Sequence, residues 1–364
     1  MKIAIILGTR PEIIKMAPVI RELEKCQENY FILHTGQHYS YNLDKVFFEQ
    51  LRLPATRYNL EVGSGSHAEQ TGKILTGVEK VLQEENPDLV LIEGDTNSIL
   101  AGALAAVKLH IKVGHVEAGL RSYDRNMPEE INRILADHCS DFLFAPTEKA
   151  KAILKGEGIP EDKIFMTGNT IVDAIYENLE IARGSASVVS ALGLKPQEYF
   201  LVTIHRQENV DNRARFTSIL EGLDRVAAEF ETPVIYPIHP HSRKRMAEFS
   251  LQPRRLMLAE PMDFFSFLQL ESSARLILTD SGGVQEEACI LTVPCVTLRD
   301  NTERPETLEV GSNILAGVSP DKIVEYAKAM LGRENYWENP FGDGTAGRKI
   351  VEIIMGARKP HSRP

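Results

Sequence analysis

The sequence predicts an α/β protein made of two Rossmann-like domains, each built on a doubly wound parallel sheet. Short apolar runs alternate along the chain with longer segments of helical periodicity, which is typical of a parallel sheet covered by helices on both faces. The alternation occurs in both halves of the chain. A length of 364 residues also exceeds one ordinary hydrophobic core, so we expect two domains.

The first half supplies five candidate strands, each followed by a loop and a helical pattern. Gly8, Thr9, Arg10 and Pro11 follow the first run and lead into an amphipathic stretch that ends at Lys25. Proline fits the first turn of a helix because its missing N–H would have no partner there. The candidate strands are residues 3–7, 30–35, 88–92, 112–116 and 142–145.

The second half repeats this order, with a long helical pattern over 213–230 and another near the end at 347–356. Its candidate strands are residues 200–204, 234–238, 256–258, 275–278 and 295–298. The expected organisation is therefore an N-terminal domain over 1–168, a connection over 169–197, a C-terminal domain over 198–344 and a final helix at about 345–364.

Composition excludes several classes of protein. A hydrophobic content of 43% and a charged content of 25% are those of a soluble globular protein. A formal net charge of −10 argues against general nucleic-acid binding. No apolar run is long enough to span a membrane, and the first residues reach a charge too soon for a signal peptide. Four scattered cysteines without a CxxC pair argue against a disulfide framework or a zinc site, so we expect a cytoplasmic protein.

The segment 279–287, TDSGGVQEE, is the most informative motif. It joins an apolar run to a helical pattern through Ser281, Gly282 and Gly283. Such a turn exposes backbone N–H groups at a helix N-terminus, which favours a phosphate. Glu287 lies one turn into the helix, where a carboxylate could bind ribose hydroxyls. The motif alone is equally compatible with a simple strand-to-helix turn that Ser281 caps.

Acidic residues follow neighbouring strands of the first half. Asp95 lies in the loop after the third run, Glu117 follows the fourth run directly, and Glu129 begins the next helical pattern. Each acid alone has a structural explanation: Asp95 as a helix cap, Glu117 as a partner of Arg121, and Glu129 through the helix dipole. Three such acids near adjacent strand ends indicate acid–base catalysis.

Basic and aromatic candidates lie at other strand ends. Arg10 and Lys15 follow the first run and could face a diphosphate or be solvated surface charges; this loop lacks GxGxxG, so no dinucleotide is expected. His205 ends the first run of the second half and is a candidate catalyst. His239 ends the next run and is a candidate substrate-binding residue, although His239-Pro-His241 is a weak metal signal. Arg304 is a candidate phosphate clamp.

With these residues assembled, the chain resembles the non-hydrolysing UDP-N-acetylglucosamine 2-epimerases. The resemblance runs nearly end to end and keeps the family's order and spacing. It rests on the segments GTRPEIIKMAP, GDTNS, HVEAGLRS, PEEINR, TIHRQEN, YPIHP, TDSGGVQEEA and RDNTERPE. It implies the glycosyltransferase-B architecture, with the active site in a cleft between two Rossmann-like domains and a C-terminal helix that returns to the first domain.

The resemblance also implies roles for individual residues. Those implied to contact UDP, its phosphates or its nucleoside are Arg10, His205, Phe267, Ser281, Gly282, Gly283, Glu287 and Arg304. Those implied to act on the sugar, as acids or as active-site cations, are Lys15, Asp95, Glu117, Glu129 and Arg133.

The implied reaction is reversible C2 epimerisation between UDP-N-acetylglucosamine and UDP-N-acetylmannosamine. Loss of UDP makes the C2 proton removable and gives 2-acetamidoglucal, and re-addition on the other face gives the epimer. No cofactor and no metal is expected, and a cytoplasmic homodimer is implied. Bacterial members carry a second, activating substrate site after GQH, but here Gln37 and His38 are followed by Tyr39, Ser40 and Tyr41, which predicts weak or absent activation.

Three alternatives stay open. A UDP-sugar glycosyltransferase of the same architecture would share the nucleotide site but would not exchange the C2 hydrogen. A regulatory protein would bind UDP-sugars without turnover. The hydrolysing relative often carries a fused kinase domain, for which the short C-terminal region leaves no room.

Overall fold

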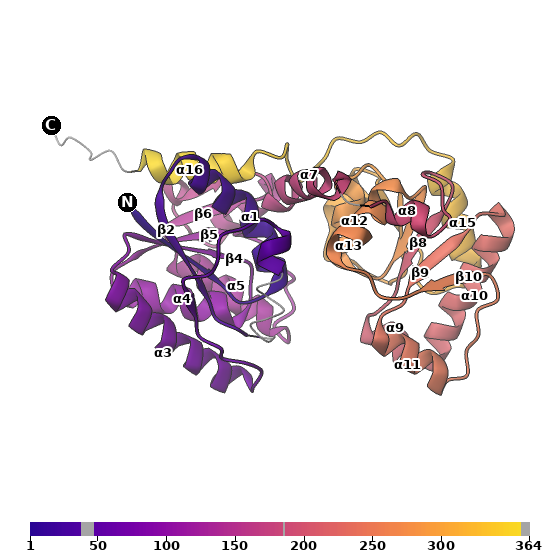
Figure 1. Ribbon diagram of the computed structural model, residues 1–364, viewed down its shortest axis with the longest axis horizontal. Coiled ribbons are helices and arrows are strands. Elements are labelled where there is room, and N and C mark those ends of the chain that lie inside the picture. Colours follow the sequence, from indigo (N-terminus) through magenta and orange to yellow (C-terminus); the bar gives the residue numbers. More distant parts are fainter. Residues whose placement is uncertain (38–46, 185, 358–364) are drawn as a thin grey trace. The chain divides into compact units, whose positions relative to one another are not determined.

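The computed structural model describes residues 1–37, 47–184 and 186–357. The chain forms two compact units, Met1–Glu177 with Phe341–Pro364 and Asn178–Pro340 (Figure 1). The first division falls inside one continuous helix, α7 (Thr170–Arg183), whereas the sequence predicted a connection over 169–197. Residues 38–46, which include Tyr39, Ser40 and Tyr41, lie outside the described residues.

The sheet of the first unit has seven parallel strands in the order β3-β2-β1-β4-β5-β6-β7. All five predicted strands are present, within one or two residues at each end. The bounds are β1 Lys2–Leu7, β2 Asn29–His34, β3 Tyr58–Asn59, β4 Leu89–Glu93, β5 Lys112–Val116, β6 Phe142–Ala145 and β7 Ile164–Met166. The sequence missed β3 and β7, because two or three residues at a sheet edge form no apolar run.

Helices cover this sheet, and local sequence sets their ends. Thr9 and Glu12 form a capping box at α1. Asp173 accepts hydrogen bonds from the N–H groups of Ala346 and Gly347 at 3.2 and 2.9 Å, which caps α16. The bounds are α1 Arg10–Lys25, α3 His67–Glu85, α4 Asn97–Lys108, α5 Pro128–Cys139, α6 Glu148–Gly156 and α16 Ala346–Gly356, with a 3-10 turn at Glu161–Lys163.

The C-terminal helix belongs to the first unit. Figure 1 shows α16 beside α1, and the two helices pack together. A Cβ atom at Gly347 would lie 3.0 Å from the backbone of Pro18, so glycine permits this close approach. The last helix in sequence is thus joined to the first.

The sheet of the second unit has six parallel strands in the order β10-β9-β8-β11-β12-β13. The five predicted strands are present, and only the three-residue β13 was missed. The bounds are β8 Phe200–Thr203, β9 Val234–Pro237, β10 Leu256–Ala259, β11 Leu276–Thr279, β12 Cys295–Thr297 and β13 Asn313–Leu315. The helices are α8 Val188–Ala191, α9 Gln207–Val210, α10 Arg213–Phe230, α11 Pro240–Glu248, α12 Phe264–Ser273, α13 Gly282–Ile290, α14 Pro305–Glu309 and α15 Pro320–Leu331.

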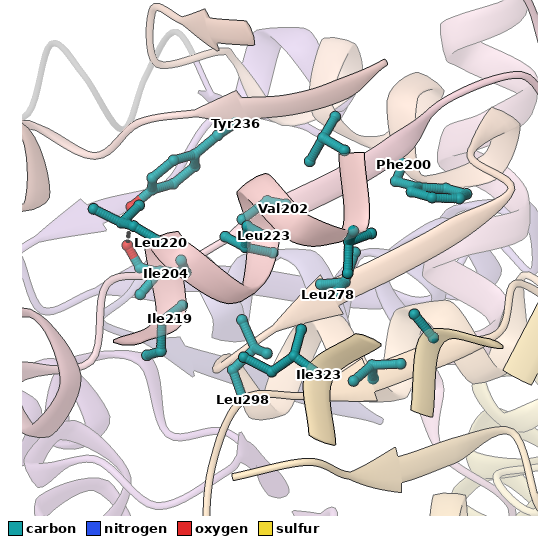
Figure 2. Packing of buried hydrophobic residues seen from close by; sticks show 14 of the residues in the cluster. Phe200, Val202, Ile204, Ile219, Leu220, Leu223, Tyr236, Leu278, Leu298 and Ile323 are labelled. Carbon is teal, nitrogen blue, oxygen red and sulfur yellow. Dashed lines mark hydrogen bonds between the residues drawn. The ribbon is translucent and has the colours of Figure 1, made fainter. Parts of the chain in front are cut away.

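One face of this second sheet packs against α10 and α15. Figure 2 shows Val202 of β8 beside Leu223 of α10, and Phe200 of β8 and Ile323 of α15 belong to the same fully buried cluster. The Tyr236 hydroxyl donates a hydrogen bond to the Ile204 carbonyl at 2.7 Å, so this aromatic side chain is both packed and satisfied. This core therefore supports β8 up to Ile204, the residue before His205.

The strand orders locate the expected binding edge of each sheet. The chain winds outward in opposite directions from β1 and β4 in the first unit, and from β8 and β11 in the second. Ligands of such sheets bind beyond the carboxyl ends of the strands at this switch point. In the described part of the chain, no helix is both long and apolar enough to cross a membrane.

Candidate functional site

Acidic groups and one lysine gather at the switch point of the first unit. The Lys15 ammonium on α1 lies 2.6 Å from both carboxylate oxygens of Glu117, the residue after β5. It also lies 3.3 Å from Oε1 of Glu93, the last residue of β4. Asn169 donates a hydrogen bond to Oε1 of Glu117 at 3.1 Å. Lys15 is therefore an ion-pair partner and not a solvated surface charge.

Glu117 is also held by its backbone. Its φ of 66° lies in the left-handed region, which is uncommon for a residue with a side chain. The sequence offered Arg121 as a structural partner for Glu117, and this interpretation is wrong. Arg121 instead pairs with Asp137 at 2.7 Å and with Glu157 at 2.6 Å.

A buried histidine supports the loops that carry these acids. His115 on β5 is fully buried, and its Nδ1 and Nε2 lie 2.7 Å from Asp137 and 2.8 Å from the Gly94 carbonyl. Burial alone would lower the pKa of His115, but Asp137 and the carbonyl raise it above its usual value. Asp137 also accepts a hydrogen bond from the Gly119 N–H at 3.2 Å. The His115–Asp137 pair therefore contacts both the loop after β4, at Gly94, and the loop after β5, at Gly119.

Glu12 is a second buried carboxyl group at this edge. Its oxygens accept hydrogen bonds from the N–H groups of Gly8 and Thr9 at 2.5 and 3.1 Å and from the Thr96 hydroxyl at 2.6 Å. Burial nevertheless raises the pKa of Glu12 to about 7. The capping acid of α1 therefore titrates near neutral pH beside the loop that carries Asp95.

Asp95 is joined to α5 by partly buried charged and polar contacts. Arg133 pairs with Asp95 and donates to Glu130 at 2.9 Å. Asn132 donates to the Asp95 backbone carbonyl at 2.9 Å. Glu130 is buried, and although burial opposes the effect, hydrogen bonds from the backbone of residues 122 and 123 lower its pKa. The structure thus brings the predicted Asp95 and Arg133 into contact.

Arg10 and Glu129 are placed differently from this group. Arg10 is the first residue of α1, and its guanidinium lies 5.6 Å from the ring centroid of Phe47. Glu129 lies in the first turn of α5 and is half-buried. Among the described residues, no hydrogen bond or ion pair joins Glu129 to Asp95 or Glu117.

In the second unit, the TDSGG turn forms the start of α13. The Ser281 side chain caps this helix by accepting a hydrogen bond from the Val284 N–H at 3.4 Å. A Cβ at Gly283 would meet nothing nearer than the Ser281 hydroxyl at 3.9 Å, and one at Gly282 would meet Glu303 at 3.4 Å. The capping interpretation is confirmed, and the open space above Gly283 also suits an anion at the helix N-terminus.

Two histidines lie beside this turn. The backbone N–H of His205 donates to the buried Asp280 at 3.1 Å, and its ring Nδ1 lies 3.4 Å from the same carboxylate. Burial lowers the pKa of His205, since the attraction to Asp280 does not fully offset the loss of water. The rings of His205 and His239 are 6.4 Å apart, and His239 caps α11. The two strand-end histidines predicted from sequence are thus neighbours.

Arg304 is anchored to the same helix. Its Nε lies 3.2 Å from Oε2 of Glu286, and its Nη1 donates to the Glu303 carbonyl at 3.2 Å. Glu303 also pairs with Arg206 at 2.7 Å. The cation proposed as a phosphate clamp therefore has a buried acidic partner that fixes its direction.

Glu287 has a buried neighbour that the sequence did not reveal. Glu271 on α12 is 1% exposed and lies within hydrogen-bonding reach of Glu287 on α13. Burial raises the pKa of Glu271 well above its usual value, and the Glu287 carboxylate raises it further. Phe267, one turn before Glu271, packs against the apolar cluster of this face of the sheet.

Sequence reasoning missed that the carboxyl groups of Glu12, Glu93, Glu130 and Glu271 are buried. Glu12 and Glu130 look like ordinary first-turn acids of helices, and burial alone distinguishes them. The available signal for Glu93 was an acid that directly ends a buried apolar strand, LVLIE. No group of three or more metal-binding side chains occurs in the described ranges.

Comparisons with known proteins agree on one family. A family model described as UDP-N-acetylglucosamine 2-epimerase matches residues 21–355. The chain is 56% identical over 361 residues to UDP-N-acetylglucosamine 2-epimerase of Methanocaldococcus jannaschii, covering 97% of this chain and 99% of that protein. It is 54% identical over 366 residues to the enzyme of that name from Methanococcus maripaludis, covering 99% and 100% of the two chains.

A solved structure gives the same result in three dimensions. The Methanocaldococcus jannaschii UDP-GlcNAc 2-epimerase in complex with UDP-GlcNAc and UDP is similar with a TM-score of 0.86 and 56% identity. The match covers 98% of this chain and 100% of that one. The predicted fold class, two Rossmann-like parallel-sheet domains, is therefore confirmed.

Proposed function

The chain belongs to the UDP-N-acetylglucosamine 2-epimerase family, and on that premise we propose that it interconverts UDP-N-acetylglucosamine and UDP-N-acetylmannosamine. The observation that carries this proposal is the group of carboxyl groups around Lys15 and Arg133 in the first unit. A sugar transferase needs one base and an acceptor site, whereas inversion at C2 needs proton removal on one face and proton return on the other.

We propose that the second unit binds the nucleotide. The N-terminus of α13, with Ser281, Gly282 and Gly283, would accept the diphosphate through N–H groups and the helix dipole. Arg304, held by Glu286, would add a fixed positive charge. His205, kept neutral by its lowered pKa, can donate one N–H hydrogen bond to a phosphate oxygen without adding charge.

Further roles follow from the same assignment. Glu287 would bind the ribose hydroxyls and Phe267 would support the base, while His239, whose ring lies 6.4 Å from that of His205, would be a further substrate-binding residue. From the first unit, we propose that Arg10 contributes a further phosphate contact from the first turn of α1.

The chemistry balances with these groups. A carboxylate removes the C2 proton while the C1–O bond breaks, and the bonding electrons leave with UDP. The products of this half-reaction are 2-acetamidoglucal and UDP. A carboxylic acid then delivers a proton to the opposite face of C2, and a UDP oxygen re-forms the bond at C1. We propose Asp95, Glu117 and Glu129 for these proton transfers. Arg133 would stabilise the ionised form of Asp95, and Lys15 would stabilise the ionised form of Glu117.

The proposed surroundings of the reaction are the cytoplasm and a homodimer. The four cysteines are free thiols, which is the state that a reducing compartment maintains. Measuring the mass of the purified protein in solution would decide the oligomeric state.

Isotope exchange tests the function. Purified protein is incubated with UDP-N-acetylglucosamine in D2O, and the recovered sugar nucleotides are analysed by NMR. Both epimers should appear, with deuterium at C2. A Glu69→Gln variant, altered at an exposed position of α3, should behave like the unmodified protein, whereas Glu117→Gln should lose exchange. Turnover without C2 deuterium would indicate a glycosyltransferase, and UDP binding without any turnover would indicate a regulatory protein.

A further inference from the structure

Glu93 is a buried acid in the first unit to which the proposed reaction gives no role. Its side chain is 2% exposed, and it ends β4 at the switch point of the sheet. The nearest cation is the Lys15 ammonium, 3.3 Å from Oε1 of Glu93. The same ammonium lies closer, at 2.6 Å, to both oxygens of Glu117. Two carboxyl groups thus compete for one positive charge.

The balance of charge around Lys15 determines whether Glu93 or Glu117 keeps a proton. The ionisable groups that face Glu93 are Lys15 and Glu12 on α1 and Glu117 after β5, with His115 on β5 close to Glu117. One ammonium cannot neutralise both Glu93 and Glu117 away from water, and an unpaired buried carboxylate is unfavourable. The shorter, two-oxygen contact assigns Lys15 to Glu117. Glu93 is then the group that stays neutral.

We propose that Glu93 is a positioning residue for the epimerisation: its neutral carboxyl group donates a hydrogen bond to Glu117, and Lys15 holds Glu117 as a carboxylate. The inference rests on the proposed role of Glu117 in proton transfer at C2. Burial, with the negative charge of Glu117 and Glu12, raises the pKa of Glu93 well above its usual value, in agreement with this geometry. Lys15, Asn169 and Glu93 together restrict the Glu117 carboxylate to one direction.

The arrangement has a consequence for pH. When Glu93 loses its proton, Glu117 loses a hydrogen-bond donor and gains a negative neighbour, so its own affinity for a proton rises. The turnover of the unmodified protein should therefore fall at alkaline pH, as Glu93 loses its proton and the Glu93–Glu117 pair becomes more negative. Removing the ionisable group while keeping a donor should remove this alkaline loss.

Two substitutions separate the hydrogen bond from the charge. Glu93→Gln keeps an N–H donor toward Glu117 but cannot ionise, whereas Glu93→Leu keeps the approximate size and removes the donor. We expect Glu93→Leu to lower kcat roughly 10- to 100-fold, as for the loss of one buried hydrogen bond to a charged group. Glu93→Gln should restore most of that loss and should show no alkaline decline in kcat. Binding of UDP, measured by calorimetry, should change less than about twofold in both variants.

Glu85 provides matched controls in the same unit. Its carboxylate is 8% exposed and pairs with Lys2 at 2.6 Å, at the amino end of β1. Since β1 and β4 are parallel, Glu85 and Glu93 belong to opposite edges of the sheet. Glu85→Gln and Glu85→Leu should leave the pH profile of kcat unchanged.

The proposal would be overturned if Glu93→Leu kept the kcat of the unmodified protein, or if Glu93→Gln kept the same alkaline decline. Infrared difference spectroscopy gives a readout independent of activity. The unmodified protein minus Glu93→Gln should show the C=O band of a buried protonated carboxyl group at neutral pH, and its absence would overturn the proposal as well. Failure of the unmodified protein to interconvert the two sugars would instead refute the proposed function, while the infrared band would still decide whether Glu93 carries the proton.

Discussion

Glu12 links the stability of the first unit to pH, and the size of the link follows from its surroundings. The carboxyl group is buried, and burial raises its pKa from the ordinary 4.5 to about 7. The native state therefore binds this proton more tightly than the unfolded chain. The contribution to stability is fully present below pH 4.5 and is lost as the pH rises to 7. Each pH unit between the two values is worth about 1.4 kcal/mol, so the total is about 3 kcal/mol.

Glu12→Gln should remove this dependence without disturbing the cap. One amide oxygen can accept from the N–H groups of Gly8 and Thr9, and the amide N–H can donate to the Thr96 hydroxyl. Relative to the unmodified protein, the variant should gain about 3 kcal/mol in free energy of unfolding between pH 4.5 and pH 8.

The assay must report on the first unit alone, because a two-unit chain need not unfold in one step. The only tryptophan, Trp337, lies in the second unit, so its fluorescence does not serve. Native-state hydrogen exchange of peptides from β1 and α1, corrected for the intrinsic pH dependence of exchange, gives the local free energy of opening. Glu84→Gln, at an exposed position of α3, is the control.

A difference between Glu12→Gln and the unmodified protein that stayed constant within about 0.5 kcal/mol over this pH range would refute the reasoning. So would an equal change in the Glu84→Gln control. Because Glu12 and Glu93 interact electrostatically, the measurement should be repeated in a Glu93→Gln background, where any coupling between the two titrations disappears.

Three further predictions follow from other contacts. Burial raises the pKa of Asp173 to about 6, so the unmodified protein should lose about 3 kcal/mol of stability as the pH rises from 4 to 6. Asp173→Asn should abolish this loss, which hydrogen exchange of the amides at the start of α16 would measure. Glu271 also has a raised pKa, so stability that it contributes at low pH is lost as pH rises; Glu271→Gln should make the second unit more resistant to urea at alkaline pH, followed by Trp337 fluorescence. Asp95→Asn should lower C2 deuterium exchange at least about 100-fold while calorimetry gives unchanged UDP affinity; equal loss of both would make Asp95 a structural residue.

Much of the fold was predictable because its signals are local. Buried parallel strands are continuous apolar runs, and all ten that the sequence marked are strands in the structure. The predicted range of α10, 213–230, agrees with the structure at both ends, since Asn212 caps its start. β3, β7 and β13 are too short to stand out, because two or three residues gain their strand character from a neighbour across the sheet and not from their own pattern.

The candidate site was less predictable, because its pairings join residues far apart in sequence. Lys15 and Glu117 are 102 positions apart, and Asp95 and Arg133 are 38. The segment HVEAGLR alone does not indicate that Glu117 pairs with Lys15 or that Arg121 pairs with Asp137. These pairings depend on the left-handed backbone of Glu117 and on the order of the strands. Sequence could place each acid at the correct edge of the sheet but could not assign its partner.

In both units a buried carboxyl group, here called the inner group, lies next to a carboxylate that the proposed function uses, here called the outer group. In the first unit Glu93 lies behind Glu117, and in the second Glu271 lies behind Glu287. In each pair the inner group has a raised pKa, since burial and the outer negative charge act in the same direction. A neutral inner acid can donate a hydrogen bond that fixes the outer carboxylate, whereas an inner amide would do so without responding to pH. Comparing the Glu→Gln variants at Glu93 and Glu271 therefore separates two effects of alkaline pH on one chain: a change in proton transfer from the first pair and a change in nucleotide binding from the second.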